Sequence, residues 1–298
     1  MSIPKENESI INLTVENEEY NLKDLLKEKM GISSRLFKRL IKNNGILING
    51  KKLKGKYEPK NNDVISILFE DEKPVYESQN IDISVIYEDY DILIVNKEPN
   101  ILVHPTKNHL DSTIANAVAY YFKKEGIKSK VRLVNRLDMD TSGILIIAKN
   151  PFGHQQMAKQ FQKNIEKKYI AIVDGIVDND EGIIDEPVGK KNKDSIKNTV
   201  IKSGKEAVTK YKVIERFKNS TMIELKIITG RTHQIRVHMS YIGHPIIGDS
   251  LYNRKSKLID RQALHSYYLR FKKARENKII NVKADLPNDM KELIKKLK

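Results

Sequence analysis

The sequence contains no cysteine. This absence excludes disulfides, thiolate nucleophiles and zinc sites with cysteine ligands. The sequence also lacks an apolar run of about 18 residues, the length that a membrane-spanning helix requires. Its N-terminal segment MSIPKENESI is polar and acidic, unlike a signal peptide. We therefore expect a cytoplasmic protein that is not associated with a membrane.

Acidic residues are outnumbered by basic ones. The 298 residues include 54 Lys and Arg against 39 Asp and Glu, which gives a formal net charge of +15. Such an excess favours a polyanionic partner such as nucleic acid or an anionic membrane surface. The length predicts more than one domain.

A basic helix is predicted near the N-terminus, in the run SRLFKRLIKNNG that starts at Ser34. Ser34 is a suitable N-cap, and the Asn-Gly pair is a suitable stop. At about 100° per residue, four cations share one face of this helix, and apolar side chains lie opposite. These cations are Arg35, Lys38, Arg39 and Lys42. Nine basic residues against one acid occur between positions 35 and 60, so we favour an RNA-binding surface over a merely solvated face.

Residues 20–70 resemble the small RNA-binding domain of ribosomal protein S-four, in which two helices precede a short hairpin. The matching features are the Ser-Arg start of the basic helix, the Ile48-Asn49-Gly50 turn and the strand from Asn62. The predicted layout is a polar, poorly ordered N-terminal tail (1–17), an S-four-like domain (18–72), a linker (73–80) and a catalytic domain (81–298).

The larger domain alternates strand-like and helical stretches. Strands are predicted as a pair within 81–105, at 144–147 and 167–175, as two more within 215–238, and at 261–271, and helices at 112–124, 154–164 and 287–298. The segment 189–212, with eight Lys against two acids, is predicted to be a mobile basic hairpin or loop. The fold class is therefore α+β: a mixed, mainly antiparallel sheet flanked by helices and loops, plus a small N-terminal α/β RNA-binding domain.

The stretch VNRLDMDTSGILIIAK (134–149) places polar chemistry directly before an apolar run. Ile144 to Ile147 have the composition of a strand that is buried on both faces. If the preceding residues are extended, Arg136 and Asp138 project to the same side, roughly 6 to 7 Å apart. Taken alone, such a pair is more often a surface ion pair worth at most about 1 kcal/mol.

Several other kinds of site are disfavoured. His233 and His238 are five residues apart, which places their rings on different faces of a strand or a helix, so a metal site is not expected. Arg231 and Arg236 instead indicate the binding of anions. No glycine-rich phosphate loop is present, and the Thr-Ser-Gly at 141–143 is not a serine-hydrolase elbow.

A carboxylate-centred site remains, with two interpretations. Asp138 and Asp140 could act as an acid and nucleophile pair that excises a base, since their separation of roughly 6 to 7 Å is near that used in glycoside hydrolysis. Alternatively, Asp138 alone could be the nucleophile in a reaction that breaks the bond between base and sugar and then rejoins them.

The run RLDMDTSG resembles the RLDxxTSG signature of the RluA family of pseudouridine synthases. Further matches occur in the same order: YEDYDILIVNK and LVHP before it, then KKYIAIVDG, TGRTHQIRVHMSYIGHPIIGD and RQALHSYYLRF. Together with the N-terminal domain, the layout is similar to the RluC/RluD-like branch, which acts on large-subunit ribosomal RNA. Two departures are Asn135 in place of the common His, and Lys97-Glu98-Pro99 in place of Lys-Pro.

The resemblance implies an enzyme that flips a uridine out of structured RNA and isomerises it without a metal or other cofactor. Asp138 would be the nucleophile, Tyr169 would stack on the uracil and handle protons, and Arg236, taken to lie on a strand, would pair with Asp138. Residues implied or expected to bind the substrate are Asn135, Arg136, Thr141, Arg231, His233 and Leu264, with Arg35, Lys38, Arg39 and Lys42 on the basic helix. The expected partner is 23S ribosomal RNA, or else tRNA, and the expected state is a monomer. A non-catalytic ribosome-assembly factor and a base-excising glycosylase are the alternatives.

Overall fold

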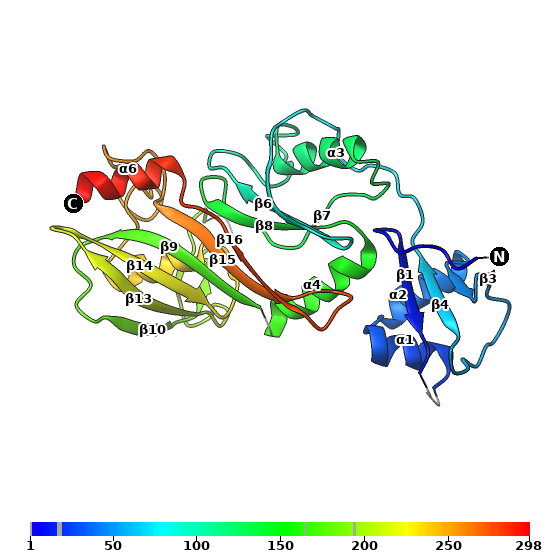
Figure 1. Cartoon of the computed structure of the whole chain (residues 1–298). Coiled ribbons are helices and arrows are strands. Elements are labelled where there is room, and N and C mark those ends of the chain that lie inside the picture. Colours follow the sequence, from blue (N-terminus) through cyan, green and yellow to red (C-terminus); the bar gives the residue numbers. More distant parts are fainter. Residues whose placement is uncertain (1, 17–19, 164, 193–194) are drawn as a thin grey trace.

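The computed structural model describes residues 2–16, 20–163, 165–192 and 195–298. Two sheets organise the chain: a four-stranded sheet near the N-terminus and a ten-stranded sheet in the remainder. We call residues 2–72 the N-terminal unit and residues 81–298 the second unit. They lie side by side, with the N-terminal unit at the right of Figure 1.

The N-terminal unit consists of β1 (Ile10–Thr14), α1 (Leu22–Met30), α2 (Ser34–Lys42), β2 (Ile46–Ile48), β3 (Lys51–Lys52) and β4 (Val64–Leu68). Its strand order is β1-β4-β2-β3, with antiparallel pairing. The prediction of a disordered tail over 1–17 is wrong for residues 10–14, which pair with β4 along their whole length. Residues 1 and 17 lie outside the described residues. This strand was missed because it depends on pairing with β4, far along the chain, and its five residues alone carry little signal.

Helix α2 presents its cations to solvent, as its periodicity predicts. Leu36 and Leu40 are buried in the core of the N-terminal unit. The N-cap is Ser33, one residue earlier than expected, and its hydroxyl accepts a hydrogen bond from the Leu36 amide at 3.2 Å. The side chains of Arg35, Lys38, Arg39 and Lys42 are exposed.

The second unit has twelve strands and four helices among its described residues. The strands are β5 (Ser84–Glu88), β6 (Ile92–Lys97), β7 (Arg132–Leu133), β8 (Ser142–Ala148), β9 (Glu166–Asp174), β10 (Glu181–Asp185), β11 (Val188–Gly189), β12 (Thr199–Val200), β13 (Val208–Arg216), β14 (Ser220–Ile227), β15 (Leu264–Lys272) and β16 (Ile279–Lys283). The helices are α3 (Ile114–Lys124), α4 (Pro151–Lys163), α5 (Gln234–Tyr241) and α6 (Asn288–Leu297). The mixed, mainly antiparallel sheet with flanking helices is confirmed.

The large sheet has the order β10-β13-β14-β9-β15-β8-β6-β5, and β16 and β7 pair with β15 and β8. Its two halves meet at β8 and β15, which run parallel and pair through His265 with Ser142 and Ser266 with Gly143. Gly143 has φ +109°, and a Cβ there would lie 2.1 Å from the Ser266 carbonyl oxygen. The close approach of β8 and β15 therefore requires glycine at this position.

Strand β8 is buried on both faces, as its apolar run predicts. Leu145 and Ile147 pack with α3 on one face, whereas Ile144 and Ile146 pack on the other face with Met157 of α4. The terminal helix α6 packs its Met290 and Leu293 into the core formed with β9 and β14. Helices thus cover the sheet and fix the strands around β8. The last residue of the helix expected at 154–164 lies outside the described residues.

Two segments differ from their predictions. The residues QIRVH, expected as the end of a strand, begin helix α5. Alternating Ile235 and Val237 suggested a strand, but both are buried in the helix, so tertiary packing overrides local β-propensity. The segment 189–212, expected as a mobile basic hairpin or loop, contains a hairpin in which the loop 190–198 joins β11 to β12, but its residues 208–212 belong to β13 of the large sheet. Residues 193–194 of that loop lie outside the described residues.

The two units are joined by specific contacts in addition to the connecting chain. Phe152 of α4 is 1% exposed and lies in the core of the N-terminal unit. Gln155 of α4 donates to the Gly31 carbonyl at 2.6 Å. Arg275 donates to the Ile10 carbonyl at 2.8 Å and pairs with buried Asp91 at 3.0 Å. The expected linker 73–80 is itself held, because the Asn116 side chain of α3 donates to the Glu77 carbonyl. Among the described residues, no helix is long and apolar enough to cross a membrane.

Candidate active site

A small cleft opens in the second unit beside the junction of the two sheet halves. Its walls come from the loop before β8, from β9, from the first residue of β15 and from α5. It has a volume of about 80 Å³ and is lined by Arg136, Leu137, Asp138, Thr141, Tyr169, Ile227, Arg231, His233, Gln234, Ile235, Arg236 and Leu264. Distant parts of the chain thus bring most of the expected site residues together.

Asp138 lies in the loop between β7 and β8, where it is the first residue of a turn over residues 138–141. The Asp138 carbonyl accepts a hydrogen bond from the Thr141 amide at 3.1 Å. The next two carbonyls accept from buried cations on either side: Lys97 Nζ donates to Met139 O at 2.7 Å, and Arg261 Nη1 donates to Asp140 O at 2.9 Å. This main chain is therefore held at three consecutive carbonyls.

Arg236 is the charge partner of Asp138. Its Nη1 donates to Asp138 Oδ2 at 2.9 Å. Its Nε and Nη2 donate to the two carboxylate oxygens of Asp249 at 2.7 and 2.8 Å. Asp249 is fully buried and also accepts from the amides of Leu251 and Tyr252. The guanidinium is thus oriented by a bidentate carboxylate, which leaves one of its donors for Asp138.

The surroundings of Arg236 stabilise its protonated, positively charged form. Burial lowers the pKa of Arg236, but the hydrogen bonds and negative charges of Asp249 and Asp138 outweigh burial and raise that pKa above its ordinary value. The guanidinium also lies 5.1 Å from the ring centroid of Tyr252. A permanent positive charge therefore faces the Asp138 carboxylate.

His233 is the second side chain close to Asp138. Its Nε2 is 3.8 Å from Asp138 Oδ2, and its Nδ1 is 3.0 Å from the Tyr252 hydroxyl. Burial lowers the pKa of His233, and nearby Asp138 only partly opposes this effect. We therefore treat His233 as neutral at pH 7. The backbone at His233 is left-handed, with φ 58°, where the chain turns into α5.

Tyr169 forms part of the cleft wall from β9. Its side chain is nearly buried, at 8% exposed. Burial raises the pKa of Tyr169 to about 12, a hydrogen bond with Ser266 lowers it, and the charge of Asp138 raises it. Tyr169 is therefore a phenol at neutral pH, with an aromatic face and a hydroxyl at the cleft.

The remaining expected residues separate into three groups. Arg136, Arg231, Thr141 and Leu264 line the cleft, and the two arginines are exposed at its opening. Asn135 does not line it: its Nδ2 donates to the Ile144 carbonyl and its Oδ1 accepts from the Ile146 amide, which links the loop to β8. The cations of α2 lie in the N-terminal unit, remote from the cleft. Asp140 is not among the lining residues, and the Ser142 hydroxyl lies 2.9 Å from His265 Nδ1, away from the cleft lining.

Four important residues were missed from the sequence: Lys97, Asp249, Tyr252 and Arg261. Lys97 was noted only as part of a motif departure, and Asp249 only as the last residue of a matching motif. Each of the four acts through a partner distant in the sequence, so no local pattern reveals it. A buried Lys or Asp in an otherwise apolar run is the one available signal.

The arrangement presents one carboxylate, a fixed cation and a phenol around a partly apolar cleft. A carboxylate in this position can act as a nucleophile or base, and the aromatic ring can stack on a planar base. Among the described residues, no cluster of three or more His, Asp or Glu side chains could hold a metal ion.

Comparisons with known proteins agree with this chemistry. A family model described as RNA pseudouridylate synthase matches residues 91–241, which include Asp138, Tyr169 and Arg236. The chain is 39% identical to RNA pseudouridine synthase YlyB of Bacillus subtilis over 264 residues, 87% of each protein. It is 37% identical to ribosomal large subunit pseudouridine synthase D of Haemophilus ducreyi over 278 residues, 87% of this chain and 83% of the relative.

Solved structures show the same fold. Human RNA pseudouridylate synthase domain containing 4 superimposes with a TM-score of 0.60 and 23% identity, covering 72% of this chain and 92% of that one. The signature around Asp138, the shared fold and the extent of these matches lead to one conclusion: the chain belongs to the RluA-type RNA pseudouridylate synthase family and acts on RNA.

Proposed function

We propose that this pseudouridine synthase modifies specific uridines of large-subunit (23S) ribosomal RNA, with Asp138 as the nucleophile. The observation that carries the assignment is the Asp138 carboxylate, 30% exposed at the cleft and bonded to Arg236 at 2.9 Å. Relatives named as ribosomal large subunit pseudouridine synthase D, 36–38% identical to this chain, support the choice of RNA.

In the proposed reaction, the target uridine leaves the RNA stack and enters the cleft, at a cost of a few kcal/mol. Tyr169 stacks on the uracil and remains a phenol that can donate or accept a hydrogen bond. Arg136 and Arg231, at the opening, contact the RNA backbone or support the displaced base, and Thr141 and His233 contact the nucleotide. Arg236 orients the Asp138 carboxylate toward the sugar.

Asp138 either adds to the anomeric carbon or removes the 2′ proton of the ribose. Either route breaks the bond between N1 of uracil and the sugar. The base then rotates and C5 bonds to the anomeric carbon. On the first route this step displaces Asp138 from its ester, and on the second the 2′ proton returns to the ribose. N1 gains a proton and the C5 proton is lost to solvent. Bonds broken and formed balance, so the proposal requires no metal or redox cofactor.

Water must stay out of the cleft while the base is free, or the enzyme would release uracil. Leu264, Ile227 and Ile235 provide an apolar lining for this purpose. The buried strand β8 holds the loop that carries Asp138 against this lining.

The nucleophile is tested with Asp138→Asn, and the matched control is Asp140→Asn, two residues away in the same turn. Tritium release from RNA labelled at C5 of uridine should disappear in Asp138→Asn, because the amide is a poor nucleophile. RNA affinity should stay within a few-fold, and Asp140→Asn should retain activity. Turnover by Asp138→Asn would show that the assignment is wrong.

The same assay separates the alternatives. A ribosome-assembly factor without activity releases no tritium in the wild type, and a base-excising glycosylase releases free uracil. The target RNA is tested by carbodiimide mapping of pseudouridine in ribosomal RNA and tRNA from cells with and without this gene. If cells without the gene lose a pseudouridine only from tRNA and none from ribosomal RNA, the assignment to 23S RNA is wrong.

We also propose that the exposed cations of α2 dock ribosomal RNA, as in the S-four-like domain that this unit resembles, and that the enzyme works as a cytoplasmic monomer. Deleting residues 1–72 is a poor test, because it would expose Phe152. Arg35→Glu with Lys38→Glu should instead weaken binding of a long ribosomal RNA fragment and flatten its salt dependence. Lys283→Glu, an exposed change on β16, is the control. If the double variant binds the ribosomal RNA fragment as tightly as the wild type, α2 does not dock RNA.

A further inference from the structure

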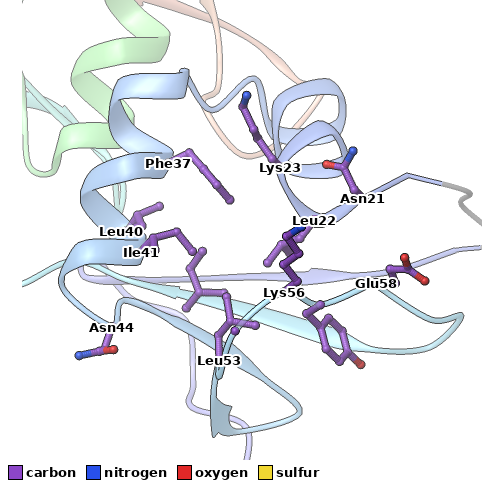
Figure 2. A pocket seen from close by; sticks show the side chains of 13 residues that line it. Asn21, Leu22, Lys23, Phe37, Leu40, Ile41, Asn44, Leu53, Lys56 and Glu58 are labelled. Carbon is purple, nitrogen blue, oxygen red and sulfur yellow. The ribbon is translucent and has the colours of Figure 1, made fainter.

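The N-terminal unit contains a groove much larger than the cleft at Asp138. It has a volume of about 770 Å³, against about 80 Å³ at the cleft. The groove lies between α1, α2 and the segment that follows β3 (Figure 2). Its size falls within the range of about 300 to 1,000 Å³ that is typical of sites for small organic groups.

The walls of the groove are apolar and include aromatic rings. Phe37 and Ile41 project into it from α2, and Leu53 faces them from the segment after β3 (Figure 2). Ile41 is 43% exposed, so an apolar surface remains uncovered in the free protein. Tyr57 also lines the groove, and its hydroxyl donates to Asp63 at 2.7 Å, which fixes the ring. These side chains offer a preformed surface for a flat apolar group.

The rim of the groove is polar and mainly cationic. Lys23 and Lys56 lie on the side of α1 (Figure 2), and Glu58 is the one acid among the lining residues. The four exposed cations of α2 lie on the face of the helix opposite its apolar side chains and do not line the groove, so its positive charge comes from Lys23 and Lys56. A ligand for this groove therefore combines a planar apolar part with negative charge, as a nucleotide within RNA does.

We propose that the groove binds one unpaired nucleotide of the RNA substrate, distinct from the uridine that is isomerised. The base packs on Phe37 and Ile41, and its phosphate meets Lys23 or Lys56. Only an unpaired base can enter, because the faces of a paired base are covered by its neighbours in the helix. The inference rests on the proposed role of the N-terminal unit in RNA binding and adds a requirement for a single-stranded position.

The absence of tryptophan from the chain gives a direct test. Ile41→Trp places a single indole at the groove, and Ile279→Trp places one on β16 at a position 53% exposed. Single-stranded RNA of ten nucleotides should quench the fluorescence of Ile41→Trp by stacking and leave Ile279→Trp unchanged. The same strand annealed to its complement, and heparin as a polyanion without bases, should bind without quenching. No quenching by bound single-stranded RNA, or equal quenching by duplex or heparin, would overturn the proposal.

A second variant measures affinity. Ile41→Glu introduces an acid at an exposed position, so the fold should be retained. It should weaken binding of an RNA with an unpaired flank about tenfold, in line with the loss of one stacked base. Ile279→Glu should have little effect on that binding, and an equal loss would contradict the groove.

Turnover separates this inference from the proposed function. A short stem-loop without the flank should be isomerised at the wild-type rate by Ile41→Glu, because it does not reach the groove. If the wild type fails on every RNA, the proposed function is wrong. If the wild type is active but Ile41→Glu binds flanked and unflanked RNA as the wild type does, only the groove is wrong.

Discussion

At the scale of single residues, the site depends on a chain of two carboxylates joined by one guanidinium. Asp249 is buried and Asp138 is partly exposed, so Arg236 is anchored on its buried side and presents a donor to the cleft. An ion pair of this kind is costly to break, since removing one partner leaves the other charge buried and uncompensated. Asp249 is thus a positioning residue for Arg236.

Asp249→Asn should lower kcat about 10- to 100-fold, because Arg236 loses its bidentate anchor and the Asp138 carboxylate loses its fixed orientation. KM for RNA should change little, since Asp249 does not reach the cleft. Steady-state tritium release measures both constants, and Glu292→Gln on the surface of α6 is the control. A fall in kcat that only matches a fall in the folded fraction would reduce Asp249 to a role in stability.

The sequence allowed part of this site to be predicted. Asp138 was a candidate from its local sequence, whereas the role of Tyr169 and the pairing of Arg236 with Asp138 came from family resemblance. Asp249 could not be predicted, because its role depends on a turn that places it against α5. The hydrogen bonds of Asn135 with the backbone of β8 could not be predicted either, because its partners lie 9 and 11 residues further along the chain.

At the scale of elements, the loop that carries Asp138 is fixed between β6 and β15. Lys97, at the end of β6, is 1% exposed, and burial lowers its pKa to about 7. Its Nζ donates to the carbonyls of Glu98 and Met139. Burial of a lysine is unfavourable for stability. The contribution of Lys97 is therefore the hydrogen bond by which it holds the loop that carries Asp138.

Lys97→Met should separate stability from activity. Methionine keeps the length of the chain and removes the buried amine, so the free energy of unfolding should stay within about 1 kcal/mol of the wild type. The Met139 carbonyl loses its donor, and we expect kcat to fall about tenfold through displacement of Asp138. Urea unfolding and tritium release measure the two effects, with exposed Lys210→Met as the control. Wild-type kcat in Lys97→Met would contradict the role of this lysine.

Long elements with strong periodicity were predicted well, and short ones were not. Strand β8, the basic helix α2 and the terminal helix α6 each carry a local pattern that agrees with their packing. Strand β1 and helix α5 do not, because β1 depends on pairing with β4, and α5 has the β-branched composition of a strand. Tertiary contacts decide such cases.

At the scale of the whole molecule, two buried histidines and one half-buried histidine are expected to make folding sensitive to acid. Burial lowers the pKa of His154, His238 and His265, and for His265 the value is about 4. The unfolded chain then binds protons between about pH 6.5 and 4 that folded His265 does not bind. Stability is therefore complete above pH 6.5 and decreases as the pH falls toward 4.

For His265 alone the loss should approach about 3 kcal/mol at pH 4, since one pKa unit corresponds to 1.36 kcal/mol. Urea unfolding at several pH values measures this slope. His265→Gln should reduce the slope between pH 6.5 and 4, whereas exposed His109→Gln should leave it unchanged. An unaltered slope in His265→Gln would assign the acid sensitivity to other groups.

The contacts of Phe152, Gln155 and Arg275 with the N-terminal unit have a consequence for target choice. These contacts hold the two units together, so the cleft and the proposed RNA-docking cations of α2 are a fixed distance apart in the folded protein. An RNA that engages both must present its uridine at one fixed span from its docking segment. Uridines of the same local sequence but at a different span would be passed over, which makes selection a matter of RNA shape more than of neighbouring bases.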